Sequence, residues 1–132
     1  MSREKCEEIV TINDKMIVTI IKESTKDGVK LQFNSVGDVK GKYNAMHTET
    51  LDLLQKMDGT NTWEVRAMDV TKEGDIIMTS GKGTGKGNLG QGEYTFMTTS
   101  KKLAWLNSTK GWVEGAVNPD NSGATLRVYT VK

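Results

Sequence analysis

The chain has 132 residues, which is enough for one domain that buries its own core without disulfide bonds. Its 18 basic and 17 acidic side chains are scattered and nearly cancel, so no basic field attracts nucleic acid. No apolar run approaches the ~18 residues of a membrane-spanning helix, and the N-terminus lacks the apolar segment of a signal peptide. We therefore predict a single cytoplasmic domain over residues 1–132, without a nucleic-acid or membrane partner.

The composition favours β-structure. Valine, isoleucine and threonine far outnumber alanine, and β-branched residues suit the pleated, half-buried surface of a sheet. Short runs of such residues are separated by glycine, asparagine and aspartate, which favour turns. The sequence therefore predicts an all-β chain that folds back on itself at each turn.

The chain opens with two apolar runs, Glu8–Ile12 and Lys15–Lys22, on either side of Asn13-Asp14. Because both residues of this pair favour turns, the segment predicts a hairpin. Apolar residues at helical spacing in the second run suggest a helix instead, but its β-branched content favours a strand. We therefore expect two short strands here.

The next segment alternates apolar and polar residues over Val29–Phe33, which predicts a strand. Gly37 and Gly41 are expected to break or bulge the chain before a longer run from Lys42 to Leu54. If that run is a strand, its inward face carries Tyr43, Ala45, His47, Glu49, Leu51 and Leu53. A helix over Glu49–Met57 is the alternative, because apolar side chains there could form a stripe.

The second half reads as strands joined by turns at Asp58-Gly59, Glu73–Asp75 and the segment that contains Pro119. The predicted strands are Thr62–Val70, Ile76–Thr84, Gly92–Thr99, Trp112–Val117 and Ala124–Val131. Their expected inward residues include Trp63, Val65, Ala67, Tyr94, Phe96 and Thr98. Lys101–Asn107 breaks the alternation, so we expect a helical turn or tight loop that caps one end of the sheet.

About eight strands in sequence order favour a closed fold. An open sheet of this size leaves two edges to protect, and closure into an antiparallel up-and-down β-barrel removes both. A barrel of about eight strands has an interior that side chains fill, or that holds one small ligand. The up-and-down barrel is our prediction, and a two-sheet sandwich is the alternative.

The C-terminal half carries a pattern of glycines and aromatic residues. It consists of Gly83-Thr84-Gly85, Gly92–Phe96, Leu103–Asn107, Gly111–Val117 and Leu126–Tyr129. This pattern resembles the allene oxide cyclase-like barrels, which include small uncharacterised prokaryotic proteins. The resemblance implies a calycin-like barrel of eight strands with an apolar lumen that self-associates into a homo-oligomer. The catalytic positions of the plant enzymes do not match residues of this chain, so cyclase activity is not implied.

Gly85–Gly90 matches the dinucleotide-binding pattern G-x-G-x-x-G, but that pattern needs a helix to begin there, and a strand is expected instead. A glycine-rich hairpin is the favoured interpretation. His47 and Cys6 are the only histidine and cysteine, so a three-histidine zinc site and a cysteine cluster are both excluded. We expect no metal and no cofactor.

His47, Glu49 and Tyr43 are the candidate catalytic residues, because burial beside a carboxylate can tune an imidazole for proton transfer. An ordinary hydrogen-bonded or surface histidine is the alternative. The candidate ligand-binding residues are Tyr43, His47, Glu49, Trp63, Tyr94, Phe96 and Trp112. The aromatic members would equally serve as core filling. Glu114 and Arg127 lie on neighbouring predicted strands and could pair across them, although an exposed pair of this kind would add little.

Three functions follow. The first is a barrel that binds a small apolar molecule in a cavity of roughly 300 Å³ or more. The second is an isomerase or cyclase that acts in the lumen by shape and orientation. The third is a structural or oligomerisation module with a filled interior.

Overall fold

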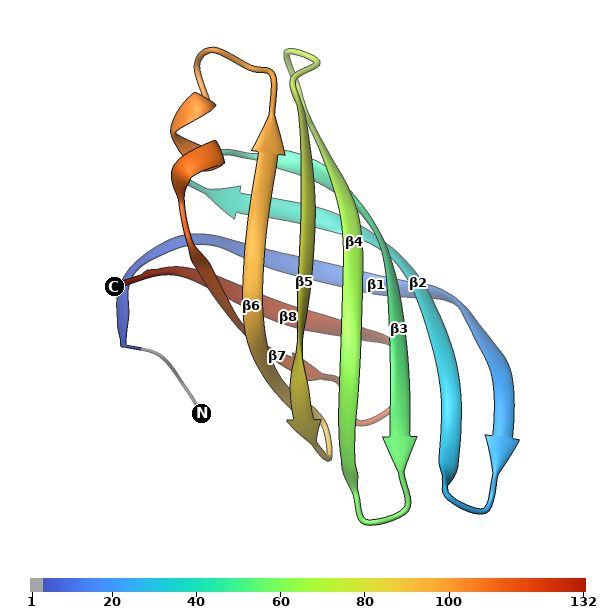
Figure 1. Ribbon diagram of the computed structural model, residues 1–132. Helices are drawn as coiled ribbons and strands as arrows, with labels where there is room; N and C mark the ends of the chain where they lie inside the picture. The colour runs from blue at the N-terminus through green and yellow to red at the C-terminus, as the bar shows by residue number, and fades with distance from the viewer. Residues whose placement is uncertain (1–3) are drawn as a thin grey trace.

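The computed structural model describes residues 4–132, in which eight antiparallel strands form a closed barrel in chain order (Figure 1). The strands are β1 (Lys5–Thr25), β2 (Gly28–Gly41), β3 (Ala45–Lys56), β4 (Thr60–Thr71), β5 (Ile76–Lys86), β6 (Leu89–Thr98), β7 (Gly111–Val117) and β8 (Gly123–Val131). Within these described residues, the one helical element is the short 3-10 helix η1 (Ala104–Ser108). The predicted all-β, up-and-down barrel is confirmed. Residues 1–3, which the domain and signal-peptide predictions include, lie outside the described residues.

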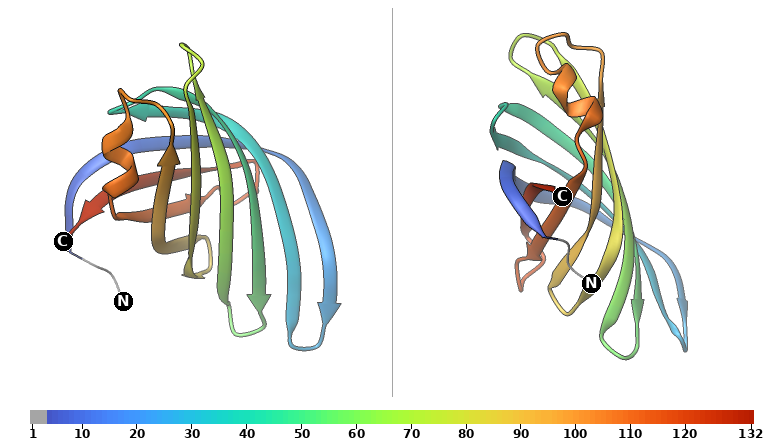
Figure 2. Two further views of the ribbon diagram at one scale, coloured as in Figure 1. Left: turned by 45° about the horizontal axis from the view of Figure 1, so that its top comes forward. Right: turned by 60° about the vertical axis from the view of Figure 1, so that its left-hand side comes forward.

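The barrel closes only partway along its first strand. β1 pairs with β8 from Lys5 to Lys15, and beyond that point it pairs with β2 alone. The β1–β2 hairpin therefore extends past the closed wall (Figure 2). Its apolar side chains are poorly covered, and Ile21 is 69% exposed. No helix within residues 4–132 is long and apolar enough to cross a membrane.

The predicted hairpin at Asn13-Asp14 is wrong. Both residues lie inside the continuous strand β1, where Asn13 pairs with Asp38 and Asp14 pairs with Gly37. Turn propensity at these positions is overridden because β2 on one side and β8 on the other supply backbone partners. The two predicted N-terminal strands are therefore one strand of 21 residues.

Gly37 does not break the strand either, because it lies inside β2 and pairs with β1 on one side and β3 on the other. Gly41 does end that strand, with a positive φ of 149° that glycine adopts readily. The following run is a strand to Lys56, so the helical alternative for Glu49–Met57 is wrong. Tyr43 precedes β3 but is buried, and the inward face expected for the rest of the run is confirmed by the buried His47 and Glu49.

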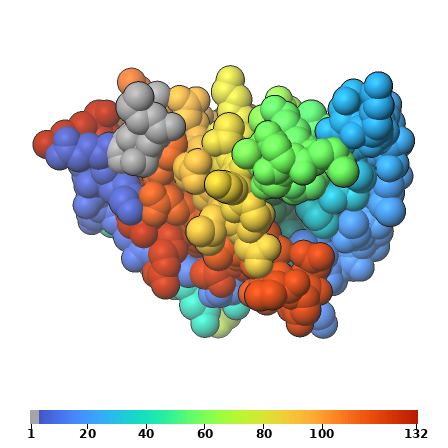
Figure 3. All heavy atoms as spheres, turned by 90° about the horizontal axis from the view of Figure 1, so that it is seen from below, coloured from blue at the N-terminus to red at the C-terminus, as the bar shows by residue number. Residues whose placement is uncertain are grey.

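Apolar side chains fill much of the barrel interior, and η1 closes the barrel at one end. Leu103 and Leu106 are buried there, as the predicted cap requires, and they pack into the core cluster. The other members are Ile9, Val10, Ile12, Val39, Tyr43, Val65, Ile77, Tyr94, Phe96, Val113 and Val128. The turns of the hairpins β1–β2, β3–β4, β5–β6 and β7–β8 lie together at the opposite end, which Figure 3 shows from below.

Candidate functional site

Three of four neighbouring strands place a polar residue in one layer of the barrel, and the fourth strand, β2, contributes a glycine. Asp14 on β1 pairs with Gly37 on β2, Gly37 pairs with His47 on β3, and His47 pairs with Asp69 on β4. Paired residues of adjacent strands point to the same side of a sheet, and here that side is the lumen, because Asp14, His47 and Asp69 are all buried. Glu49 follows His47 by two residues and joins the same face.

The imidazole of His47 lies between two carboxylates. Its Nδ1 is 2.5 Å from Asp69 Oδ1, and its Nε2 is 2.9 Å from Glu49 Oε1. Asp69 is held from its other side, since the hydroxyl of Tyr43 donates to Oδ2 at 2.6 Å. Tyr43, Asp69, His47 and Glu49 therefore form one continuous buried hydrogen-bonded chain, which contains all three predicted catalytic candidates.

Asp14 faces this chain without joining it. Its Oδ1 is 3.8 Å from His47 Nε2, which is too long for a hydrogen bond, and its side chain is only 2% exposed. Among residues 4–132, neither carboxylate oxygen of Asp14 has a hydrogen-bond partner. A buried carboxylate without partners is costly, so this position calls for a physical reason.

The cluster shifts the proton affinities of its members. Burial disfavours an imidazolium, but the hydrogen bonds to Asp69 and Glu49 outweigh it and raise the pKa of His47 to about 10. Burial, followed by the charge of Glu49, raises the pKa of Asp14 to about 7. Burial and Asp69 raise the pKa of Tyr43, and burial raises that of Tyr94 well above its usual value.

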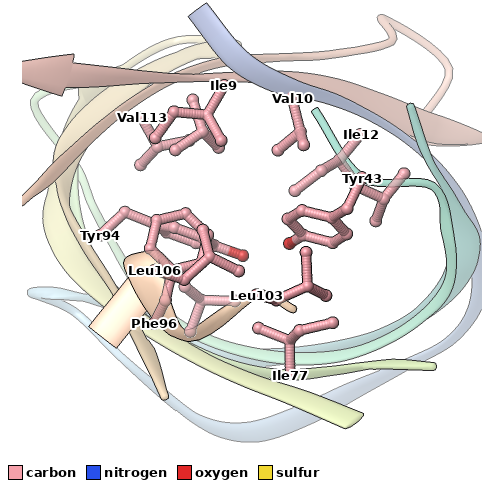
Figure 4. Close-up of a cluster of buried hydrophobic side chains, with 13 residues drawn as sticks. Ile9, Val10, Ile12, Tyr43, Ile77, Tyr94, Phe96, Leu103, Leu106 and Val113 are labelled. Carbon is pink, nitrogen blue, oxygen red and sulfur yellow. The ribbon is translucent and has the colours of Figure 1, made fainter. Parts of the chain in front are cut away.

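Two tyrosine hydroxyls point toward the middle of the barrel from opposite walls, as Figure 4 shows for Tyr43 and Tyr94. The hydroxyl of Tyr94 donates to Thr79 Oγ1 at 2.8 Å. Its ring packs edge-on against Phe96, with ring centroids 5.4 Å apart. Phe96 is therefore part of the hydrophobic core and packs against Tyr94 beside the site.

An apolar pocket lies between the polar layer and the end where the hairpin turns gather. Its volume is about 100 Å³, below the roughly 300 Å³ that a lumenal binding site was expected to have. Its lining includes Leu51, Trp63, Val65, Tyr94, Val113 and Leu126. Leu51 and Val65 each lie one inward position from the layer of Glu49 and Ala67, so the pocket ends beside the polar cluster.

Glycines on β5 and β6 make room for this pocket and for its aromatic wall. A Cβ on Gly83 would lie 2.7 Å from Trp63 Cζ2, and one on Gly81 would lie 3.0 Å from Tyr94 Cδ1. The indole Nε1 of Trp63 donates to the carbonyl oxygen of Thr84 at 3.2 Å. The glycine-rich segment is therefore a hairpin, as predicted, whose missing side chains leave space inside the barrel.

Trp112 does not line the lumen. It pairs with Glu93 on β6 and with Tyr129 on β8, while its neighbour Val113 is part of the core, so Trp112 points outward. Its indole Nε1 donates to Glu114 Oε2 at 3.3 Å. It borders a groove of about 590 Å³ whose lining combines charged residues of both signs with apolar residues of the inward row, among them Leu31, Leu53 and Trp63.

The predicted pair of Glu114 and Arg127 is wrong, although the two residues are opposite each other in register. Each has a different partner on β1: Lys5 Nζ lies 2.9 Å from Glu114 Oε1, and Arg127 Nη1 lies 3.1 Å from Glu8 Oε1. These pairs are exposed and contribute little.

Sequence reasoning missed Asp14 and Asp69. The signal for Asp69 was present, because it continues the inward series of Trp63, Val65 and Ala67 by one more step of two. The signal for Asp14 was hidden by its neighbour Asn13, since the pair looks like a turn.

Comparison with family models gives no match, and comparison with curated proteins gives none either. Among solved structures, the chain is similar to a protein of unknown function from Clostridium acetobutylicum, with a TM-score of 0.83, 16% identity, and coverage of 96% of this chain and 98% of that one. A β-barrel-like protein from Acinetobacter baumannii has a TM-score of 0.79, 17% identity, and coverage of 96% and 94%. An enzyme from Penicillium herquei has a TM-score of 0.67, 15% identity, and coverage of 97% and 99%. At these identities the similarity shows the β-barrel fold alone.

Proposed function

We propose that the barrel binds a small molecule that has an apolar body and a polar end group. The observation that carries this proposal is the position of the apolar pocket, which ends one layer from the buried Glu49. Ligand sites commonly combine an apolar lining with a few convergent polar groups. Here the hydroxyl of Tyr94 and the carboxylates beside His47 are the polar groups available to orient a ligand.

The size of the pocket limits the ligand. A cavity of about 100 Å³ suits one ring or a short alkyl chain rather than an extended lipid. Additional apolar surface continues outward from it, because Ile21, Leu31, Leu53 and Trp63 are paired in one row across β1 to β4. A longer apolar body can therefore rest on this row with its polar end in the pocket.

The test is thermal stabilisation and tryptophan quenching by a panel of short-chain alcohols and amines, monoterpenoid alcohols and single-ring phenols, whose end groups can donate hydrogen bonds to the carboxylates. We expect binding by a subset, which Trp63→Phe weakens because Trp63 lines the pocket. The matched control is Trp105→Phe in η1 at the capped end of the barrel, which should leave binding unchanged because Trp105 is 39% exposed and lies away from the pocket. If every compound leaves the melting temperature unaltered, the proposal fails and a structural module with a filled barrel becomes the better hypothesis.

A second candidate is an isomerase or cyclase, in line with the resemblance to allene oxide cyclase-like barrels. It is favoured by the buried carboxylates and tyrosine hydroxyls at the closed end of an apolar pocket, where a bound chain would be held in one orientation. One structural neighbour is an enzyme, so this fold can house a reaction. Turnover of a bound compound that Glu49→Gln abolishes while binding remains would separate this candidate from simple binding. Self-association stays a prediction.

A further inference from the structure

The carboxylate of Asp14 is the least satisfied polar group of the site. It is buried from solvent, it lies beside two other carboxylates, and no described residue hydrogen-bonds to either of its oxygens. An ionised carboxylate that is buried without a hydrogen-bond donor costs several kcal/mol, and its ion-pair partner among the described residues, His47, lies 3.8 Å away and is hydrogen-bonded to Glu49 and Asp69 instead. The buried position of Asp14 is explained if a metal cation binds in the space that its carboxylate faces.

The distances around that space suit a single metal ion. His47 Nε2 lies 2.9 Å from Glu49 Oε1 and 3.8 Å from Asp14 Oδ1, and one ligand atom of each residue falls within 4.8 Å of the others. Two ligands that are each ~2.1 Å from an ion lie about 3 to 4.2 Å apart. Small side-chain adjustments would therefore bring all three atoms to bonding distance from one centre.

The surroundings orient the imidazole for this role. Asp69 accepts a hydrogen bond from Nδ1 of His47, which keeps a proton on that nitrogen, so loss of the other ring proton would leave the Nε2 lone pair facing Glu49 and Asp14 for a metal. Tyr43 holds Asp69 in turn. A carboxylate behind a ligating histidine is a recurrent feature of metal sites, because it sets the tautomer and raises the basicity of the ligand.

We propose that Asp14, His47 and Glu49 bind one divalent first-row transition-metal ion in the lumen of the barrel. One imidazole nitrogen and two carboxylate oxygens suit Zn²⁺, Mn²⁺ or Fe²⁺, and the imidazole disfavours Mg²⁺ and Ca²⁺. Three protein ligands leave coordination positions open for water or a ligand. Binding transfers the Nε2 proton of His47 to solvent. The expectation of no metal counted histidines and cysteines only, whereas two ligands of this site are carboxylates.

This inference does not depend on the proposed function, and its test uses metal alone. The full chain is stripped with a chelator, and Co²⁺ is titrated while its visible d–d absorption is followed. We expect saturation at one ion per chain with the bands of a four- or five-coordinate site, and displacement by Zn²⁺. Asp14→Asn and Glu49→Gln keep the size of each side chain and should weaken binding more than ~100-fold, while Asp69→Asn should weaken it ~10–100-fold.

The control variant is Glu64→Gln, which removes an exposed carboxylate from the outer face of β4 and should leave the titration unchanged. Circular dichroism and the urea midpoint establish that each variant is folded. In the unmodified chain, the resonances of the His47 ring should change on addition of Zn²⁺, which tests the site without any substitution. The proposal is overturned if Co²⁺ binds only with the spectrum of the hydrated ion, or equally well to Asp14→Asn and Glu64→Gln.

Discussion

Asp14 on β1 faces His47 on β3 across the strand that separates them, with Asp14 Oδ1 3.8 Å from His47 Nε2. The approach is possible because the residue between them on β2 is Gly37, which pairs with both. A Cβ at position 37 would lie 2.7 Å from Asp14 Oδ1 and 1.9 Å from the carbonyl oxygen of Asn13. The absence of a side chain at this position is therefore part of how the site is built.

Gly37→Ala is expected to lower the free energy of unfolding by about 3 kcal/mol, because the added methyl group forces the β1 backbone and Asp14 to move. The control is Gly74→Ala, where the added Cβ meets nothing within 4 Å and only a positive φ of 91° opposes it, at a cost of about 1 kcal/mol. Urea unfolding measures both. Equal losses in the two variants would contradict the steric role of Gly37.

Tyr43→Phe is expected to cost about 1–3 kcal/mol, because it leaves an oxygen of the buried Asp69 without its 2.6 Å donor. Tyr129→Phe is the matched control, since Tyr129 pairs with the outward-facing Trp112 and lies on the outer wall. Tyr43→Phe, but not the control, should also alter the chemical shift of the His47 Nδ1 proton, because that proton is hydrogen-bonded to Asp69. A loss of stability without that change would indicate lost packing rather than lost hydrogen bonding.

Alternation of apolar and polar residues was sufficient to predict the strands that form the wall, and turn residues located most of the hairpins. It failed at Asn13-Asp14, where two turn-forming residues lie inside a strand that has partners on both sides. Local propensity carries no information about partners that are distant in sequence, such as Ala124 opposite Asp14. The merging of the first two predicted strands is a consequence of those distant contacts.

Half of the candidate site could be predicted from one strand. His47 and Glu49 share a face with Leu51 and Leu53, so their inward position follows from a period of two. Asp69 could have been placed on the inward face by the same period. Its layer, and both the face and the layer of Asp14, depend on the register of β1 with β2 and of β3 with β4, which contacts between distant segments determine. Trp112 was misplaced because it is an aromatic residue beside the buried Val113 and is itself only 5% exposed, although Glu114, two residues further along, marks the outer face of the strand.

The cap at the end of the barrel should contribute strongly to stability. Leu106 is fully buried within η1, so Leu106→Ala is expected to cost about 2–5 kcal/mol by leaving a cavity in the core. Trp105, its neighbour in the same helix, is 39% exposed, and Trp105→Ala should cost less despite the larger side chain. Chemical unfolding of both variants measures the difference. A larger loss for Trp105→Ala would contradict the assignment of Leu106 as the plug.

Tyr94 should make the barrel sensitive to strongly alkaline solution. Burial raises the pKa of its phenol well above the usual value, whereas in the unfolded chain a tyrosine ionises near pH 10. The contribution of this group to stability is fully present below about pH 10 and is lost as the pH rises further, by up to about 1.4 kcal/mol per unit.

Tyr94→Phe loses the hydrogen bond to Thr79, so it should be less stable at pH 7. Its unfolding free energy should nevertheless fall less steeply than that of the unmodified protein between pH 10 and 11, as urea titrations at each pH would measure. Equal slopes for the two proteins would mean that Tyr94 ionises as readily in the folded barrel as in the unfolded chain.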